Sequence, residues 1–146
     1  MSAPDFHFAT NAIFRHLLDR YGKEALVDYW RSLSREHYRR RIEAWRSGGP
    51  AAIAADWQAY FAREPQAEVD VLVREQEVEL VVRVCPAIKH LRDHGRDIVP
   101  CFCEHCDHTC GVMAEEAGYV FTRSGGMGSC RQRFTKGSGS DHARLP

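Results

Sequence analysis

The sequence lacks a long apolar run and an excess of charge of either sign. Lysine plus arginine number 20, and aspartate plus glutamate also number 20, so no overall electrostatic attraction to nucleic acid is expected. No apolar stretch approaches the length that spans a bilayer, and the N-terminus shows no charged-then-apolar signal peptide. We therefore expect a cytoplasmic protein with a small molecule as its partner, and neither nucleic acid nor membrane; the oligomeric state stays open.

Internal repeats of solenoid length are also absent. The chain of 146 residues is long enough to form one domain with a real core. We expect a helical part over residues 1–66 and a sheet- and cysteine-rich part over residues 67–135. The remainder, residues 136–146, consists mostly of glycine, serine and charged residues and should be a disordered tail.

Apolar residues with helical spacing fill the N-terminal part. The spacing predicts a first helix ended by Gly22 and a long second helix from Lys23 to Arg46. Gly48 and Gly49 should stop the second helix, and Pro50 suits the first turn of a third.

The hydrophobic period changes to two near residue 67. Valines alternate with charged residues on both sides of Glu75-Gln76, which predicts an antiparallel hairpin. A second hairpin is expected from residues 119–123 and 129–135. Two shorter helices, over residues 86–94 and 103–117, should pack on one face of this sheet. The expected fold is therefore α+β, with N-terminal helices and a four-stranded, mainly antiparallel sheet.

Cysteine is unusually dense in one segment. Of the six cysteines, four lie within ten residues: Cys101, Cys103, Cys106 and Cys110. Thiols at this density suit zinc, iron or an iron–sulfur cluster, and they also suit redox or nucleophilic chemistry. The segment has no pair of CxxC knuckles, so its spacing does not identify the metal.

Helical geometry gathers three of these thiols. In a helix over residues 103–117, Cys103, Cys106 and Cys110 fall within an arc of about 60° and should face the interior. His105 and His108 lie on the opposite side and are expected to face solvent. Plain core packing of the cysteines is the alternative to a chemical role.

The other two cysteines are expected near the same interior. Cys130 shares a strand face with Phe134 and should point inward. Cys85 lies where a strand gives way to a helix that has Pro86 in its first turn. Unpaired amides and the helix dipole at that place should lower its thiol pKa, which would suit a nucleophile or an anionic metal ligand; a buried capping residue is the alternative.

A catalytic thiol also needs a base. The candidates near Cys85 in sequence are His90, His94, Glu104 and His105. We take Cys85 and His105 as the catalytic pair. The expected ligands of a zinc, iron or iron–sulfur centre are Cys103, Cys106 and Cys110, with Cys85 or Cys130 completing the site.

Three features of the sequence resemble a known family. Cys85-Pro86 before a short helix, a later cysteine-bearing helix, and the strand Cys130-Arg131-Gln132-Arg133-Phe134 after a glycine-containing turn resemble the L-2-amino-thiazoline-4-carboxylic acid hydrolase-like family, over about residues 68–135. The resemblance implies an α+β fold and hydrolytic opening of a small sulfur-containing ring at a carbon–nitrogen bond. On this basis we expect a hydrolase of a small sulfur- or nitrogen-containing molecule that uses a cysteine thiolate or a bound metal.

The glycine-ended turn and the Cys-x-x-x-Phe strand are also similar to small-molecule-sensing domains called 4-vinyl reductase-like. That similarity implies the alternative function, a metal-, iron–sulfur- or small-molecule-binding sensor or redox module without turnover. An open coordination position beside a titratable group would favour the hydrolase, whereas a closed four-thiolate site would favour the binding module.

Overall fold

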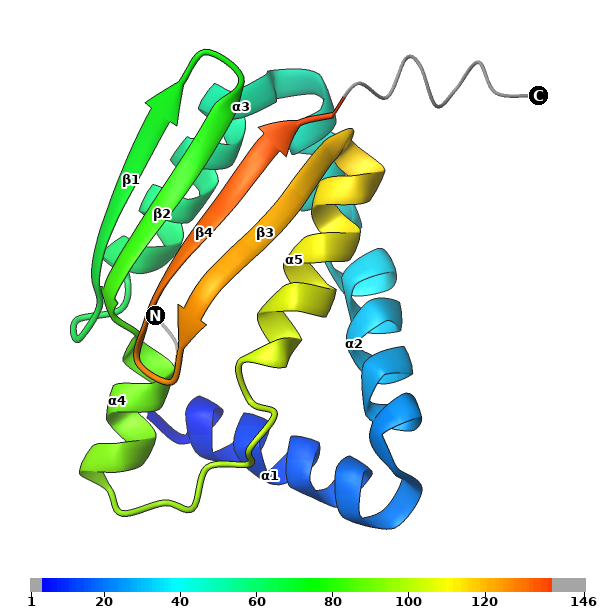
Figure 1. Ribbon diagram of the computed structural model, residues 1–146, viewed down its shortest axis with the longest axis vertical. Coiled ribbons are helices and arrows are strands. Elements are labelled where there is room, and N and C mark those ends of the chain that lie inside the picture. Colours follow the sequence, from blue (N-terminus) through cyan, green and yellow to red (C-terminus); the bar gives the residue numbers. More distant parts are fainter. Residues whose placement is uncertain (1–3, 138–146) are drawn as a thin grey trace.

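Two hairpins form a four-stranded antiparallel sheet (Figure 1). The structure is a computed structural model that describes residues 4–137. The strands are β1 (Glu68–Arg74), β2 (Glu77–Val84), β3 (Tyr119–Gly126) and β4 (Ser129–Lys136). They are ordered β1-β2-β4-β3, so the two hairpins meet through β2 and β4. The α+β fold expected from the change of period is confirmed.

The β2–β4 pairing places apolar residues opposite one another. Val78 lies opposite Phe134, and Val82 lies opposite Cys130. Along β4, Gln132 and Phe134 are buried and Cys130 is half-buried, whereas the arginines between them are exposed. The predicted inward face of this strand is therefore confirmed.

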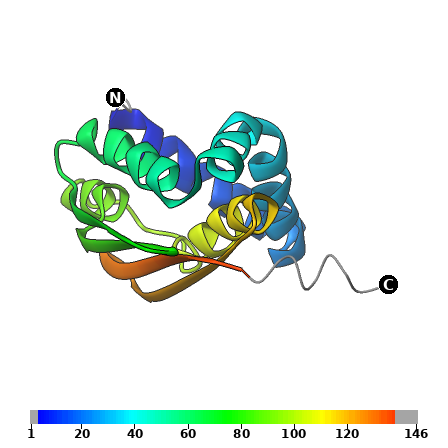
Figure 2. The same cartoon turned by 90° about the horizontal axis from the view of Figure 1, so that it is seen from above.

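Helices cover one face of the sheet and leave the other open (Figure 2). The helices are α1 (Pro4–Tyr21), α2 (Lys23–His37), α3 (Arg39–Ala62), α4 (Pro86–Asp93) and α5 (Glu104–Ala117). The helices α3 and α5 pack on the sheet, and α2 lies against α5 on the side away from it. No helix among residues 4–137 is long and apolar enough to cross a membrane.

The prediction of a single long helix from Lys23 to Arg46 was wrong. The helix breaks at Tyr38 (φ −97°, ψ 16°), because α2 packs beside α5 while α3 packs over the sheet, and one straight helix cannot follow both directions. The break expected at the paired glycines is present within α3: Gly49 has a non-helical backbone (φ 70°, ψ −159°), α3 is kinked there, and Pro50 follows directly. Trp45 before the kink and Trp57 after it both contact Phe134, with ring centroids 5.3 and 6.2 Å apart respectively.

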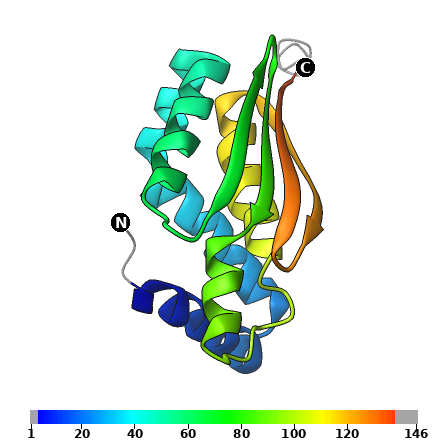
Figure 3. The same ribbon diagram turned by 90° about the vertical axis from the view of Figure 1, so that its left-hand side faces the viewer.

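The expected position of α4 was also wrong. It begins directly after β2 and extends beyond the end of the sheet, where it packs against α1 (Figure 3). Its residues Ile88 and Leu91 belong to a second core with Phe14, Trp30 and Phe102, separate from the core beneath the sheet. Cys85 packs against both cores. The tail expected over residues 136–146 lies, from residue 138 on, outside the described residues.

Candidate thiol site

Cys85 occupies the junction between β2 and α4. It is the N-cap residue of α4, with Pro86 in the first turn, as the sequence predicts. Its backbone N–H donates to the carbonyl of Gly128 (2.8 Å), which ties the junction to the β3–β4 turn. Burial raises the pKa of the Cys85 thiol to about 11, against the opposing effect of the nearby N–H groups of Ile88 and Ala87. The low pKa expected at a helix N-terminus was therefore wrong, because desolvation of a thiolate outweighs these amides.

The thiols of α5 follow the expected stripe. Cys103 is the N-cap residue, and Gly118 ends the helix in the left-handed conformation (φ 91°). Cys110 is buried in the core beneath the sheet, while Cys103 and Cys106 are half-buried. Burial raises the pKa of Cys106 to about 11 and raises that of Cys110 further. These cysteines are therefore neutral thiols near neutral pH.

Cys106 interacts electrostatically with four other cysteines, and these five residues are called the thiol group. Burial is the main cause of the raised pKa of Cys85, Cys103, Cys110 and Cys130, and a charge on Cys106 would raise each of these pKa values further. Cys110 belongs to the core beneath the sheet, Cys85 and Cys130 pack against it, and Cys85 and Cys103 pack against the second core; a single interior site shared by all five stays a prediction.

Cys101 stands outside this group. It is buried in the second core, and burial raises its thiol pKa. The charges that act on it are those of Lys23, Glu104 and Arg15, and an ion pair joins Lys23 Nζ to Glu104 Oε1 at 2.7 Å. Cys101 is therefore a natural control for the other thiols.

The expectation that His105 and His108 face solvent was wrong. His105 packs among Phe14, Trp30 and Phe102, and His108 stacks on Trp30 with ring centroids 5.6 Å apart. The reason is that α1 and α2 cover the side of α5 that faces away from the sheet. Both long faces of α5 are therefore in contact with other elements.

His105 and Cys106 form a hydrogen-bonded pair. The Nε2 atom of His105 lies 3.7 Å from the Cys106 sulfur, and its Nδ1 atom lies 2.5 Å from the carbonyl oxygen of Phe102. Since a carbonyl only accepts, Nδ1 carries the proton and Nε2 is left as an acceptor. Burial lowers the pKa of His105. The sequence assigned this histidine to Cys85, whereas the structure pairs it with Cys106.

Two further groups from the second hairpin complete the surroundings of Cys106. The buried Gln132 donates from Nε2 to the Cys130 sulfur (3.5 Å), and its side chain lowers the pKa of Cys106. Arg123 binds Asp107 through two hydrogen bonds (2.8 and 2.7 Å). The arginine lowers the pKa of Cys106 and the aspartate raises it, so their effects oppose each other.

Sequence reasoning missed Gln132 and Tyr60. The signal for Gln132 was present, because a polar residue on the core face of β4 needs a partner. Tyr60 comes from α3. Burial of its hydroxyl raises its pKa, and Glu64, Tyr38, Cys106 and Cys85 add to the rise. Its spacing alone indicates only an aromatic core residue.

A metal centre is not preformed here. Among residues 4–137, no group of three or more histidine, cysteine, aspartate or glutamate side chains is arranged to hold a metal ion. The zinc, iron or iron–sulfur centre therefore stays a prediction from the sequence. The thiols lie near one another, but they would have to move to form a closed zinc site.

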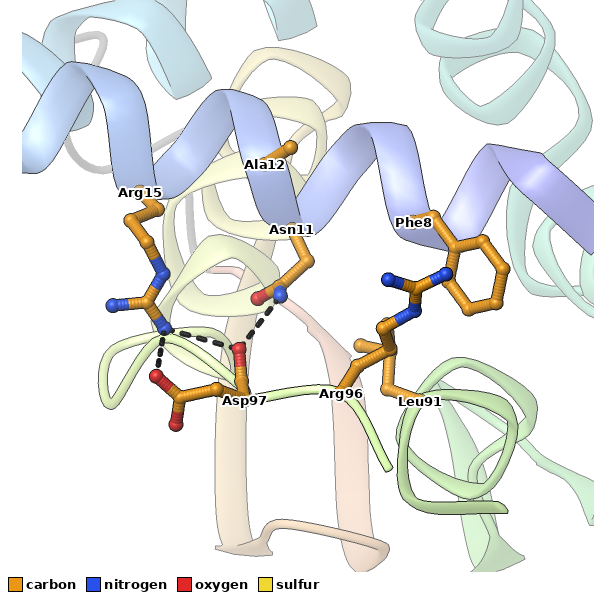
Figure 4. Close-up of a pocket in the computed structure, with 7 residues that line it drawn as sticks. All are labelled: Phe8, Asn11, Ala12, Arg15, Leu91, Arg96 and Asp97. Atoms are coloured by element: carbon orange, nitrogen blue, oxygen red, sulfur yellow. Dashed lines mark hydrogen bonds and ion pairs between the residues drawn. The ribbon is translucent and has the colours of Figure 1, made fainter. Parts of the chain in front are cut away.

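Two hollows of the surface lie away from the thiols. One, of about 290 Å³, lies between α1 and the loop after α4 (Figure 4). There Asn11 and Arg15 both donate to the carbonyl of Asp97, and the Arg96 guanidinium lies 4.2 Å from the Phe8 ring centroid. The other, of about 450 Å³, lies along α2. Neither is lined by a cysteine.

Comparison with known proteins identifies no family for the chain. No family model, no curated protein and no solved structure matches the chain. The resemblance to the hydrolase-like family therefore remains a prediction, and the candidate site depends on its own geometry.

Proposed function

We propose that the protein is a hydrolase that opens a carbon–nitrogen bond in a small sulfur- or nitrogen-containing molecule, with Cys106 as the nucleophile. The observation that carries the proposal is the Cys106–His105 pair, held in one tautomer by the Phe102 carbonyl. A nucleophile, a base and a group that orients the base are the recurring parts of nucleophilic catalysis. The substrate class comes from the sequence resemblance.

The resting pair is neutral. Burial lowers the pKa of His105 and raises that of Cys106 to about 11, so near neutral pH the thiol keeps its proton and Nε2 is free to accept it. Proton transfer therefore accompanies attack, as in a serine–histidine pair, and no thiolate–imidazolium pair is stored beforehand.

The reaction takes place in two balanced steps. Nε2 of His105 takes the thiol proton while the Cys106 sulfur bonds to the substrate carbon, and the imidazolium then protonates the leaving nitrogen as the carbon–nitrogen bond breaks. Water next adds to the same carbon and gives a proton to Nε2. The bond between that carbon and the Cys106 sulfur then breaks, and the His105 imidazolium returns its proton to the Cys106 sulfur.

Gln132 stabilises the charge that develops during attack. Its side-chain amide is buried, donates to the sulfur of Cys130 (3.5 Å) and lowers the pKa of Cys106, so it favours negative charge at Cys106. A buried donor aimed at a developing charge is an effective catalytic group because no solvent has to reorganise.

The test is ring opening of L-2-amino-thiazoline-4-carboxylate, followed by mass spectrometry as a product heavier by one water. We expect turnover by the wild type, loss of turnover in Cys106→Ser, and unchanged turnover in Cys101→Ser. Cys101→Ser is the matched control, because Cys101 comes from the same segment but lies outside the thiol group. Circular dichroism checks that each variant is folded.

Each contrary result has a separate meaning. Loss of activity in Cys85→Ser with retention in Cys106→Ser would move the nucleophile to Cys85. A folded wild-type protein that opens neither this ring nor a panel of related amides and amidines would contradict the hydrolase.

A second candidate is a binding module without turnover. The presence of Cys85, Cys110 and Cys130 at one core favours it, because soft thiols are the ligands of zinc, iron and iron–sulfur clusters. Elemental analysis of protein purified without added metal, with an ultraviolet–visible spectrum, tests this candidate. A metal-free protein with six titratable thiols would exclude a resident centre. A small-molecule partner and a cytoplasmic location, where thiols stay reduced, belong to both candidates.

A further inference from the structure

Cys103 and Met127 bring two sulfur atoms into contact. The Cys103 sulfur at the start of α5 lies 3.8 Å from the Met127 thioether sulfur in the β3–β4 turn. Two sulfurs that share a tetrahedral metal with bonds of about 2.3 Å lie about 3.8 Å apart. The observed separation therefore matches that of two ligands on one metal ion.

The turn holds the methionine in this place. Met127 has a positive φ of 54°, which is costly for a residue with a side chain, and among residues 4–137 no other residue except glycine has a positive φ. Its backbone N–H donates to the Cys103 sulfur (3.1 Å). A Cβ added at the preceding Gly126 would lie 3.8 Å from the same sulfur. The backbone thus approaches Cys103 closely and presents Met127 to it.

Met127 is also exposed, at 38% of its surface. An apolar side chain in a strained turn gains little from packing there, so its position is not explained by the core. The third sulfur is that of Cys106, one turn further along α5: its backbone N–H donates to the carbonyl of Cys103 (3.2 Å), and residues three apart on a helix have neighbouring side chains. Cys106 can therefore supply a third sulfur ligand.

We propose that Cys103, Met127 and Cys106 form a binding site for Cu(I). Thiolates and thioethers are soft ligands and select this ion, whereas zinc accepts thiolate, imidazole and carboxylate but uses thioether poorly. A site of two cysteines and one methionine also agrees with the absence, among the described residues, of three histidine, cysteine or acidic side chains arranged for a metal. The site does not depend on the hydrolase; if both exist, Cu(I) blocks Cys106 and inhibits turnover.

Methionine methyl resonances give the direct test. The chain has three methionines, so protein labelled with ¹³C at the methionine methyl groups gives a simple spectrum. We expect equimolar Cu(I), added without oxygen, to shift the resonance of Met127 and to leave that of the buried Met113 in place. A Met127 resonance that stays fixed would overturn the site.

Matched variants measure the affinity by competition with a coloured Cu(I) chelator. Met127→Leu removes the thioether at nearly constant volume and should weaken Cu(I) binding about tenfold or more, within the range of losses known at metal sites. Met113→Leu and Cys101→Ser should bind as the wild type does, and Cys103→Ser should lose most of the affinity. The Zn(II) affinity should be the same in Met127→Leu and the wild type.

Equal Cu(I) affinity in Met127→Leu and the wild type would overturn the methionine's role. Equal losses in Met127→Leu and Met113→Leu would show a general effect on folding instead of ligation, and would also overturn it. Neither result bears on ring opening, so failure of this site and failure of the hydrolase are distinguishable.

Discussion

At the scale of single residues, burial decides the chemistry of the thiols. A helix N-terminus should favour the thiolate of Cys85, yet its pKa rises to about 11 because the group is enclosed between two cores. The same cause acts on Cys106 and, with the opposite sign, on the imidazole of His105. Desolvation always favours the neutral form, so it prepares a neutral thiol–imidazole pair.

This pair predicts the pH dependence of turnover. His105 must be neutral to act as a base, and burial lowers its pKa below the usual value of about 6.5. We therefore expect kcat/KM to fall only on the acid side of that value and to stay level through neutral pH. The value of kcat/KM should not change again until the pH approaches about 11, where the thiol of Cys106 ionises. A narrow bell-shaped kcat/KM profile centred near neutral pH would contradict the neutral pair and indicate a stored thiolate.

At the scale of elements, helix α5 is defined by how it ends and by what covers it. Gly118 stops it in a left-handed conformation, and the backbone N–H of Gly118 donates to the carbonyls of Ala114 and Glu115. The first hairpin and the end of α5 follow from local signals of this kind. The position of α4 does not, because its packing against α1 depends on where β2 leaves the sheet.

Two glycines of α5 give a matched stability test. A Cβ at either Gly118 or Gly111 would meet no atom within 4 Å, so only the backbone conformation differs. Gly118→Ala places alanine at φ 91° and should lower the free energy of unfolding by about 1–2 kcal/mol. Gly111→Ala lies within the helix and should raise it by about 0.5–1 kcal/mol. Urea unfolding measures both; the same sign of change in the two variants would contradict the assigned end of α5.

At the scale of the whole molecule, the sheet joins the two hairpins through β2 and β4. On its helix-covered face the link is Phe134 against Trp45 and Trp57. On its open face, Arg131 and Arg133 of β4 form ion pairs with the carboxylate of Glu79 of β2, at N–O distances of 3.2 and 2.6 Å. Glu79 is almost fully covered, although a solvent-facing glutamate was expected from the alternation, because the arginine side chains lie over it.

Glu79 predicts how stability falls in acid. Its hydrogen bond with Arg133 lowers its pKa below the usual value of 4.5. A carboxyl group whose pKa is lowered by folding stabilises the fold at pH values above its pKa in the unfolded chain. This contribution is lost as the pH falls through its pKa in the folded protein. The urea concentration at the midpoint of wild-type unfolding should therefore decrease as the pH falls below about 4.5. Glu79→Gln should be less stable at pH 7 but should converge with the wild type in acid.

The matched control for this effect is Glu75→Gln, in the exposed turn of the first hairpin. It should follow the wild type at every pH. A constant difference between Glu79→Gln and the wild type from neutral to acid would contradict the linkage, because it would mean that protonation of Glu79 costs nothing.

The sequence by itself determined the two periods, and with them the hairpins, the end of α5 and the inward faces of α5 and β4. These follow from local physics: side-chain repeats of 3.6 and 2.0, and the conformational freedom of Gly118. Cys106, Cys110 and Cys130 therefore lie where the pattern places them.

Only the tertiary structure decided how these elements meet. It covered His105 with α1 and α2, turned its imidazole toward Cys106, and brought Met127 onto Cys103. It also reversed the expected pKa shift of Cys85. The cover of His105 and the Cys103–Met127 contact depend on residues distant in the chain, and the pKa of Cys85 depends on burial; local periodicity carries no information about either.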